Sequence, residues 1–363
     1  MNTSNYFDIR PVLRKLVSRS ALSEEEVHQT VNSILEGKLS EAAIASFLVA
    51  MSMKGETSEE IRAILQTIKR HAIRISPKIT GPLVDTCGTG GDVIKSFNIS
   101  TAAAVVASSA GMKIAKHGNR SVSGFCGSAD FLEYIGFDLQ TSPEKVSSAI
   151  EKFGIGFLYA PNFHPALRRV AAARSIIGIR TVFNIAGPLS NPCTNLTGQV
   201  IGVFGTYLLE PIAHAIQNTG LNDAMIVHSH DGLDELSNTC ENDILRISDN
   251  QIERIRLHPK MLNMQVAKQS QILVNSKEES LRATLQVIFG VASQEKEDIV
   301  VLNASAALVI AKVASDFQEG VDIARSLIKN GKPQQKLREL VRWCGTEERL
   351  ESAIKNFIPN CSL

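Results

Sequence analysis

The chain has 363 residues and a net charge of +1, with 44% hydrophobic and 21% charged residues. This balance is typical of a globular protein with one large domain or two ordinary ones. It argues against a nucleic-acid-binding surface or a polybasic membrane patch, and no apolar run reaches the roughly 18 residues that span a bilayer. The cysteines are scattered without a C-x-x-C pair and the N-terminus lacks a signal-peptide pattern, so we expect a cytoplasmic protein with reduced thiols.

The N-terminal part of the chain shows the apolar periodicity of helices. Ser23 and Glu26 form the capping-box pattern that precedes a helix, and the pattern recurs at residues 57–60. Apolar stripes at residues 44–51 and 61–68 follow the helical spacing. We expect these stripes to form a core or a contact between subunits.

From about residue 82 the pattern changes to short apolar strands that alternate with helices, which predicts a mostly parallel sheet covered by helices. A hairpin is expected over residues 243–258 around Asp249-Asn250, and a charged helical region over 334–358. Expected strands lie at residues 82–84, 112–115, 155–159, 200–204, 225–227 and 299–302.

A second helical stretch interrupts the α/β pattern at about residues 165–192, where Gly187-Pro188 and Asn191-Pro192 act as breakers. The predicted fold class is therefore α/β, with a small all-helical domain and a large α/β domain that has a mostly parallel central sheet. The expected helical domain comprises residues 1–74 and the insert at about 165–192, and the α/β domain comprises residues 75–164 and 193–363.

The segment DTCGTGGD at residues 85–92 lies between an expected strand and an expected helix. Its closely spaced glycines allow backbone N–H groups to turn inward beside a helix N-terminus, and such a nest binds phosphate. The segment matches neither the dinucleotide motif nor the P-loop. The alternative is a plain tight turn.

A second polar cluster, KHGNRSVSG at residues 116–124, follows another expected strand. Its lysine, asparagine, arginine and serine side chains suit an anion-binding loop, although a solvated surface loop is the alternative. Because both clusters follow strands in one Ala/Gly-rich region, their coincidence favours phosphate binding.

An acidic cluster, HSHDGLDE at residues 228–235, follows the strand expected at 225–227. Adjacent carboxylates at the end of a strand suit hard cations, and Mg²⁺ prefers one or two carboxylates together with phosphate oxygens and water. The alternative is an acidic turn around Asp231-Gly232.

The helical insert carries Arg168, Arg169 and Arg174. These arginines form either a solvated basic face or, where one points into a cleft, a bidentate ligand for a carboxylate.

Taken in order, these blocks resemble the anthranilate phosphoribosyltransferases, a family with the nucleoside-phosphorylase-II-like fold. The resemblance covers roughly residues 10 to 340. The matching blocks are GTGGD at 88–92, NIST at 98–101, KHGNR at 116–120, GSAD at 127–130, HPA at 164–166, RTVFN at 180–184 with GPL at 187–189, and DGLDE at 231–235.

The resemblance implies a role for many of these residues. Gly88, Asn119, Arg174 and His164 would contact anthranilate, and Ser100, Asp234 and Glu235 would bind one or two magnesium ions. No catalytic residue is assigned, but His117 and His164 are candidates for shaping the pocket or accepting a proton. Phosphoribosyl pyrophosphate (PRPP) would contact Gly88, Gly91, Asp92, Ser96, Asn98, Ile99, Ser100, Thr101, Lys116, His117, Gly118, Asn119, Arg120, Ser121, Val122, Ser123, Gly124 and Ser128.

The resemblance also implies transfer of the phosphoribosyl group of PRPP to the amine of anthranilate, the second step from chorismate in L-tryptophan biosynthesis. It implies a homodimer formed through the helical domain, with neither nucleic acid nor a membrane as partner. One alternative is a pyrimidine nucleoside phosphorylase-like enzyme, which needs no paired carboxylates such as Asp234-Glu235. Another is a non-catalytic relative that binds nucleic acid, which the near-zero net charge disfavours.

Overall fold

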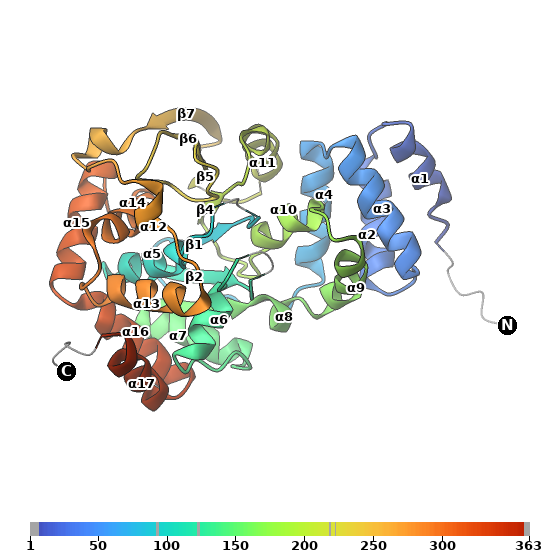
Figure 1. Ribbon diagram of the computed structural model, residues 1–363. Helices are drawn as coiled ribbons and strands as arrows, with labels where there is room; N and C mark the ends of the chain where they lie inside the picture. The colour runs from blue at the N-terminus through green and yellow to red at the C-terminus, as the bar shows by residue number, and fades with distance from the viewer. Residues whose placement is uncertain (1–6, 92–93, 122–123, 218, 222, 359–363) are drawn as a thin grey trace.

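A twisted β-sheet forms the centre of the protein (Figure 1). The structure is a computed structural model that describes residues 7–91, 94–121, 124–217, 219–221 and 223–358. Within these residues the sheet has seven strands in the order β3-β2-β1-β4-β5-β6-β7. The strands are β1 (Leu83–Gly88), β2 (Lys113–Gly118), β3 (Ile155–Tyr159), β4 (Gly198–Gly202), β5 (Asp223–Ser229), β6 (Asn242–Ser248) and β7 (Gln251–Leu257).

The strands from β3 to β5 run parallel, and β6 and β7 complete the sheet as an antiparallel hairpin. Asp249 and Asn250 join the hairpin with φ angles of 49° and 63°. Two adjacent residues of positive φ make the tight turn whose twist matches that of the flanking strands. The predicted hairpin is confirmed, and so is the α/β fold class with a mostly parallel sheet.

Both faces of the parallel strands are buried, which explains why these strands are mostly apolar in sequence, whereas the edge strand β7 is largely exposed. Successive side chains enter different cores: Val200 packs into one hydrophobic cluster and Ile201 into the other, and Met225 and Ile226 separate in the same way. The helices that surround the sheet are α5 (Ile99–Ser108), α6 (Ser128–Tyr134), α7 (Pro143–Phe153), α11 (Leu209–Ile216), α12 (Gln269–Ile272), α13 (Lys277–Ile288), α14 (Gln294–Ile310), α15 (Phe317–Lys329), α16 (Lys332–Cys344) and α17 (Glu347–Phe357). Short 3₁₀ turns lie at Pro165–Leu167, Thr206–Leu208 and Pro259–Leu262.

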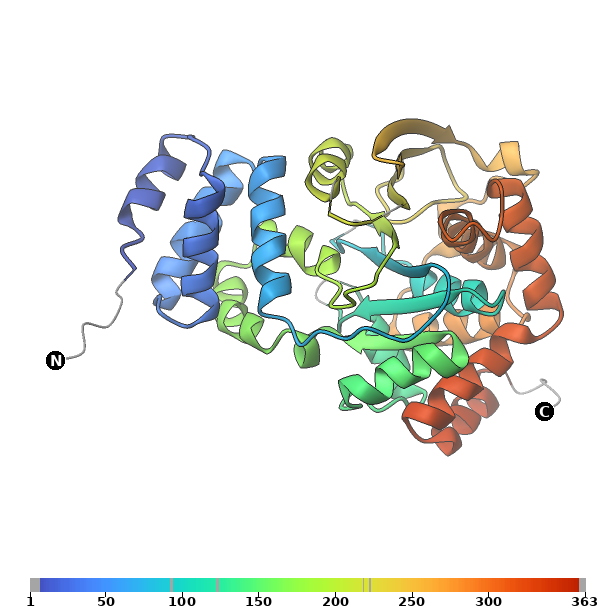
Figure 2. The ribbon, with the colours of Figure 1, turned by 180° about the vertical axis from the view of Figure 1, so that it is seen from behind.

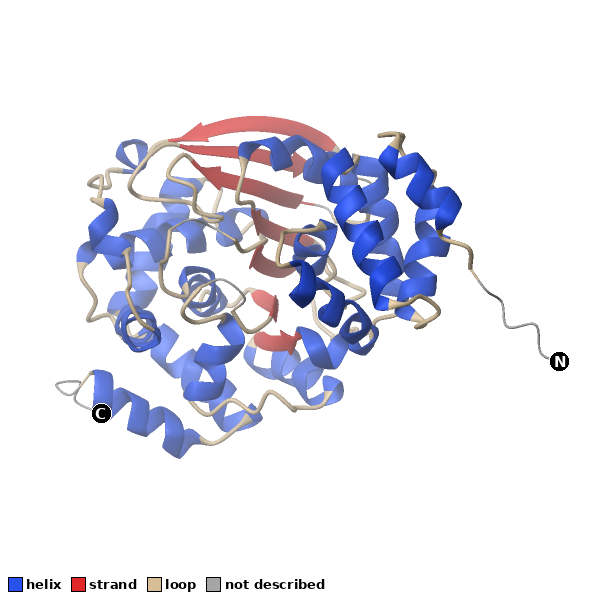
Figure 3. Ribbon diagram, turned by 45° about the vertical axis from the view of Figure 1, so that its right-hand side comes forward, coloured by secondary structure: helices blue, strands red, loops and turns tan. Residues whose placement is uncertain are grey.

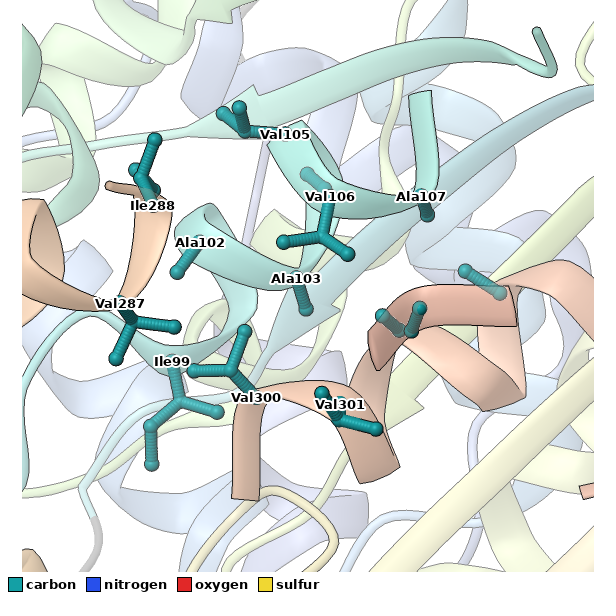
Figure 4. Close-up of a cluster of buried hydrophobic side chains, with 14 of the residues drawn as sticks. Ile99, Ala102, Ala103, Val105, Val106, Ala107, Val287, Ile288, Val300 and Val301 are labelled. Atoms are coloured by element: carbon teal, nitrogen blue, oxygen red, sulfur yellow. The ribbon is translucent and has the colours of Figure 1, made fainter. Parts of the chain in front are cut away.

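Helices α5 and α14 form the central layer on one face of the sheet. Small residues on α5 allow a close approach, and Figure 4 shows Ala103 beside Val301 of α14. The strand predicted at residues 299–302 is therefore wrong, because these residues lie inside α14. A buried helix and a buried strand both contain a continuous run of apolar residues. The length of this segment separates the two, because α14 is longer than a typical strand.

The helical part of the protein stands beside the sheet, as Figure 2 shows from behind. It comprises α1 (Arg10–Val17), α2 (Glu24–Leu35), α3 (Glu41–Lys54), α4 (Ser58–Arg70), α9 (Arg168–Ile177) and α10 (Val182–Leu189), whereas the short helix α8 (Ala160–Phe163) follows β3 and contacts it. Capping boxes at Ser23 and Thr57 begin α2 and α4, as the sequence predicts.

The apolar stripes of α3 and α4 form the core of this helical part. Phe47, Leu48, Ile61 and Ile64 are fully buried within the chain. The stripes therefore offer no exposed surface for a second subunit, and a contact between subunits would involve other side chains.

Helices from the mid-chain insert pack on the N-terminal helices: α9 contacts α2 and α3, and α10 contacts α3 and α4. Figure 3 shows the helical group apart from the strands, which lie between helices of their own. This packing supports the division into domains at residues 74, 164 and 192, which we retain as a proposal. Among the described residues, the helices are all too short or too polar to cross a lipid bilayer.

Candidate active site

The predicted phosphate and metal loops meet at one edge of the sheet. Strands β1 and β4 are paired so that Gly88 lies opposite Gly202, and Gly202 in turn lies opposite Val227 of β5. Because parallel strands end at the same edge, the segments after β1, β2 and β5 gather there, next to the start of α5. Ligands bind at this edge in open α/β sheets.

The glycine loop, residues 88–91, turns sharply between β1 and α5. Gly90 and Gly91 have φ angles of 67° and 83°, which favour glycine. The Gly90 amide donates a hydrogen bond of 2.6 Å to Asp234 Oδ2. The hydroxyl of Thr89 is buried and has no hydrogen-bond partner among the described residues. The loop therefore has an unused polar group beside its turned backbone.

The acidic loop fits closely against the glycine loop and α5. A Cβ atom on Gly88 would lie 2.2 Å from Asp234 Oδ2, so glycine is required for the two loops to meet. Glu235 Oε1 accepts a hydrogen bond of 3.0 Å from the amide of Ser100, near the start of α5. Burial raises the pKa of Asp234, and the Gly90 hydrogen bond opposes this effect.

The acidic loop is held in shape by buried polar side chains. Asp231 accepts hydrogen bonds of 2.6 Å from Ser229, 2.7 Å from Ser237 and 2.5 Å from Thr239. Asn303 of α14 donates to the carbonyl of Leu236 at 2.7 Å and accepts from its amide at 3.0 Å. The carboxylates of Asp234 and Glu235 are thus fixed by the loop that carries them.

These residues fit a magnesium ion that shares its coordination with substrate. Ser100, Asp234 and Glu235 line a small cavity of about 10 Å³ at the strand ends. The described residues contain no cluster of three or more His, Cys, Asp or Glu side chains suited to holding a metal without help. Mg²⁺ takes one or two carboxylates and completes its octahedron with phosphate oxygens and water, so this donor set suits it.

Lys116 lies in the second half of β2 and is buried between β1 and α5. Its Nζ donates hydrogen bonds to the Thr86 carbonyl at 2.7 Å and to Ser100 Oγ at 3.2 Å. Burial lowers the pKa of Lys116, and the nearby carboxylate of Asp85 opposes this effect. Lys116, His117 and Gly118 belong to β2, so the predicted flexible loop begins later than the sequence indicated.

The segment after β2 is tied to α6 through one carboxylate. Asp130 accepts hydrogen bonds from the amides of Ser121 at 3.0 Å and Gly127 at 2.9 Å, and from Arg120 at 3.1 Å. Arg120 also forms a bidentate pair with Glu133 at 2.7 and 2.8 Å. In this structure Arg120 therefore faces α6, and its predicted contact with PRPP stays a prediction.

Several other residues predicted to bind PRPP are engaged by the protein itself. Asn98 donates to Ser280 Oγ of α13 at 3.4 Å, and Ile99 is buried in the core. Ser128 Oγ donates to the Asn119 carbonyl at 3.3 Å. Thr101 Oγ1 is buried without a hydrogen-bond partner in the described part of the chain.

Ser96, Gly118 and Ser121, which are also predicted to bind PRPP, are likewise in contact with other parts of the protein. Ser96 forms an isolated bridge with Leu273, and a Cβ on Gly118 would lie 2.3 Å from Ser128 Oγ. Ser121 Oγ donates to the Gly124 carbonyl at 2.7 Å. Asp92, Val122 and Ser123 lie outside the described residues.

A buried pair of histidines lies on the helical side of the sheet edge. The ring centroids of His117 and His164 are 5.1 Å apart. Burial lowers the pKa of His164 to about 4 and that of His117 well below its usual value, so both rings are neutral at pH 7. In the described structure, His117 Nε2 and both ring nitrogens of His164 lack a partner at hydrogen-bond geometry.

Arg174 is half-buried on α9, and burial lowers its pKa. It has no ion pair or side-chain hydrogen bond with any described residue, so its guanidinium can still bind a ligand. The guanidinium of Arg169 lies against Gly37, in the space that a Cβ atom on this glycine would take. Arg168 is exposed on the same helix.

Comparison with known proteins places this site in a family. The helical bundle domain of a glycosyl transferase family matches residues 10–72, and its a/b domain matches residues 80–334. The chain is 42% identical to the anthranilate phosphoribosyltransferase of Acetivibrio thermocellus over 335 residues, which are 92% of this chain and 96% of that protein. The corresponding protein of Nitrosopumilus maritimus is 36% identical over 343 residues, 94% of this chain and 98% of its own.

The chain belongs to the anthranilate phosphoribosyltransferase family. A crystal structure of the Thermus thermophilus anthranilate phosphoribosyltransferase superposes with a TM-score of 0.85 at 35% identity, covering 92% of this chain and 98% of that one. The Saccharomyces cerevisiae enzyme in complex with PRPP and Mg superposes at 0.81 with 26% identity, covering 92% and 96%. The same yeast protein has also been solved with 4-fluoroanthranilate.

Reasoning from the sequence missed the polar residues beneath the site of this family member. Asp85 is fully buried on β1, where it accepts from the His117 amide at 3.0 Å and from Gln199 at 3.1 Å. Burial raises the pKa of Asp85. A carboxylate and an amide side chain inside apolar strands were the available signal, because buried polar groups require partners. Asp231 was visible in the motif, but its role inside the loop was not.

Proposed function

We propose that the protein transfers the phosphoribosyl group of PRPP to the amine of anthranilate, giving N-(5-phosphoribosyl)anthranilate and pyrophosphate. This reaction is the second step from chorismate in L-tryptophan biosynthesis. The observation that carries the proposal is the meeting of the glycine loop with Asp234 and Glu235 at the sheet edge, in a chain of this family. That arrangement suits a metal-bound pyrophosphate.

The α/β side would bind PRPP. The turned backbone of the glycine loop would lie against phosphate oxygens, with the Gly90 and Ser100 amides holding Asp234 and Glu235 in place, and Lys116 would add a positive charge. A magnesium ion held by Ser100, Asp234 and Glu235 would neutralise charge on the departing pyrophosphate. Because Asp234 and Glu235 are fixed by hydrogen bonds before substrate binds, little reorganisation accompanies the reaction.

The helical side would bind anthranilate. Arg174 would accept its carboxylate, with Asn119, His164 and Gly88 beside the ring and amine. An aromatic amine is neutral at pH 7, so its lone pair attacks without a strong base, and orientation makes the main contribution. The neutral rings of His117 and His164 shape this side of the pocket or take up the amine proton.

The homodimer, the cytoplasmic location and the binding of one or two magnesium ions belong to the same proposal. Support for the dimer comes from exposed apolar side chains on packed helices of the helical part. Val17 on α1 is 78% exposed, Met53 on α3 is 75% exposed and Ile176 on α9 is 72% exposed. Sedimentation that shows a stable monomer at micromolar concentration would exclude the dimer.

The decay of anthranilate fluorescence tests the reaction. We expect decay that requires PRPP and Mg²⁺ together, with pyrophosphate as the second product. Phosphorolysis of uridine, without such a decay, would instead indicate a nucleoside phosphorylase. A gel shift with duplex DNA at ordinary salt, in a protein without either activity, would indicate the nucleic-acid-binding relative.

A further inference from the structure

Arg180 lies where the helical domain, the β4–α11 connection and the glycine loop meet. It directly precedes Thr181, the N-cap residue of α10, and its backbone carbonyl accepts a hydrogen bond of 3.4 Å from Ser52 of α3. Its main chain is thus anchored to the helical domain. Its side chain leaves that domain and stacks on Phe204, with the guanidinium carbon 4.1 Å from the ring centroid.

The same side chain lies against the glycine loop. Arg180 Nε lies 3.2 Å, and Cδ and Cζ lie 3.4 Å, from the position that a Cβ on Gly91 would take. Gly91 has a φ of 83°, so this part of the loop depends on a conformation that side chains disfavour. Arg180 therefore reaches from the helical domain to the segment expected to hold PRPP.

The surrounding side chains fix the stack. Phe204 packs edge to face on Tyr207 at a centroid distance of 6.1 Å. Burial raises the pKa of Tyr207, with the charge of Arg180 lowering it and that of Glu56 raising it. Within the described residues Arg180 has no salt bridge, so the aromatic ring directs its guanidinium.

We propose that Arg180 is a positioning residue that holds the glycine loop in its PRPP-binding shape through its stack on Phe204, and so couples that loop to the helical domain. The proposal rests on the function proposed above in naming PRPP as the ligand of the loop. Three glycines give the loop many conformations, and ordering them on binding costs affinity. A side chain packed on the loop removes part of that cost in advance.

Arg180 acts here through Phe204, and this separates it from a residue that touches phosphate by charge. Loss of either partner should weaken PRPP binding similarly, whereas a charge contact would depend on Arg180 alone. A cation–π contact at an exposed site corresponds to roughly two- to fivefold in affinity.

The kinetic test compares Arg180→Met, Phe204→Leu, the double variant and Arg180→Lys. The control is Lys152→Met, which removes a similar stack on Trp343, at 3.9 Å, between α7 and α16. We expect each single variant to raise the KM for PRPP about two- to fivefold, with kcat and the KM for anthranilate essentially unchanged. The double variant should be no worse than the poorer single variant, and Arg180→Lys should recover little, because lysine lacks the planar group.

The opposite pattern would overturn the proposal. It would consist of an unchanged KM in Phe204→Leu together with full recovery in Arg180→Lys, which is the behaviour of a direct charge contact. Effects of Lys152→Met equal to those of Arg180→Met would show a general loss of stability.

A measurement without substrate separates this inference from the proposed function. Hydrogen exchange at the amides of Thr89, Gly90 and Gly91 should become faster in Arg180→Met and Phe204→Leu and stay unchanged in Lys152→Met. Equal exchange rates in all variants would refute the coupling, whatever the enzyme turns over. Absence of PRPP turnover in the parent, with faster exchange in the two variants, would refute the proposed function and leave the coupling intact.

Discussion

The two sides of the candidate site differ in how their charged side chains are satisfied, although the buried hydroxyls of Thr89 and Thr101 on the α/β side also lack partners among the described residues. On the α/β side, Asp234, Glu235 and Lys116 already hold hydrogen bonds to the backbone of neighbouring elements. On the helical side, Arg174 and the ring nitrogens of His164 have no such partners among the described residues.

This difference is explained by the charge that each side would meet. A pyrophosphate with bound metal carries concentrated charge, and a site for it works best when its dipoles are fixed in advance. A flat aromatic acid carries a single carboxylate. Polar groups of the helical side that lack partners in the free protein would gain hydrogen bonds when such an acid binds.

The largest effect is expected at the acidic loop. Asp234→Ala combined with Glu235→Ala should lower kcat by about a thousandfold or more, because charge on the leaving pyrophosphate loses its metal. Turnover as a function of Mg²⁺ concentration measures this, with Glu253→Ala on the exposed strand β7 as the control. Full activity of the double variant in the presence of a chelator would contradict the assignment of Asp234 and Glu235 as magnesium ligands.

The next effect concerns Lys116. Lys116→Ala should weaken the binding of PRPP by about thirtyfold and that of anthranilate much less, because the charge of the lysine would interact with phosphate oxygens. The variant also leaves the Thr86 carbonyl buried without its partner, so it should lose about 1–3 kcal/mol of unfolding free energy. Separate titration of each substrate and urea denaturation distinguish these effects, with Lys113→Ala in the same strand as the control. A selective loss of anthranilate affinity would mean that β2 faces the other substrate.

Arg174 tests the helical side. Arg174→Ala should raise the KM for anthranilate by about tenfold or more and leave PRPP binding unchanged, because a charge-assisted contact contributes roughly 1.5–3 kcal/mol. Arg174→Lys should restore part of the loss. Aniline, which lacks the carboxylate, should be a poor substrate that is indifferent to the change.

Neighbouring arginines provide matched controls for this prediction. Arg168→Ala and Arg169→Ala should leave the KM for anthranilate unaltered, since Arg169 packs against the backbone position of Gly37. An unchanged KM in Arg174→Ala would transfer the role to one of these two residues.

The smallest effect is a dependence of stability on pH. The pKa of His164 is about 4 in the folded protein, against a usual value of 6.5. As pH falls, the histidine of the unfolded chain is therefore protonated before that of the folded protein. The contribution of His164 to the free energy of unfolding is present above about pH 6.5 and is lost as pH falls toward 4. Between pH 6.5 and 5.5 the effect of this histidine should lower the free energy of unfolding by about 1 kcal/mol. Urea denaturation at both pH values should show a smaller loss in His164→Asn, and an identical loss would place the effect elsewhere.

The sequence predicted the features that depend on local pattern. The capping boxes of α2 and α4, the β6–β7 hairpin and the parallel strands were all expected from spacing and turn residues. The incorrect prediction of a strand at residues 299–302 shows the limit of local patterns. An apolar run does not reveal which distant segment will bury it, and that segment decides between helix and strand.

The candidate site follows the same rule. Motifs in order along the chain indicated the glycine, basic and acidic loops, and the strand register brings them together. Which of their side chains face a ligand depends on contacts between distant segments. Asn98 faces α13 and Arg120 faces α6 for that reason, whereas the buried position of Asp85 follows from its neighbours across the sheet.

Calorimetric titration of PRPP in the presence of Mg²⁺ tests the division of the site most directly. It would compare the parent, the Asp234→Ala/Glu235→Ala variant and Arg174→Ala. We predict that binding is lost in the acidic-loop variant and unchanged in Arg174→Ala. Equal weakening in both variants would contradict the assignment of the two sides to two different substrates.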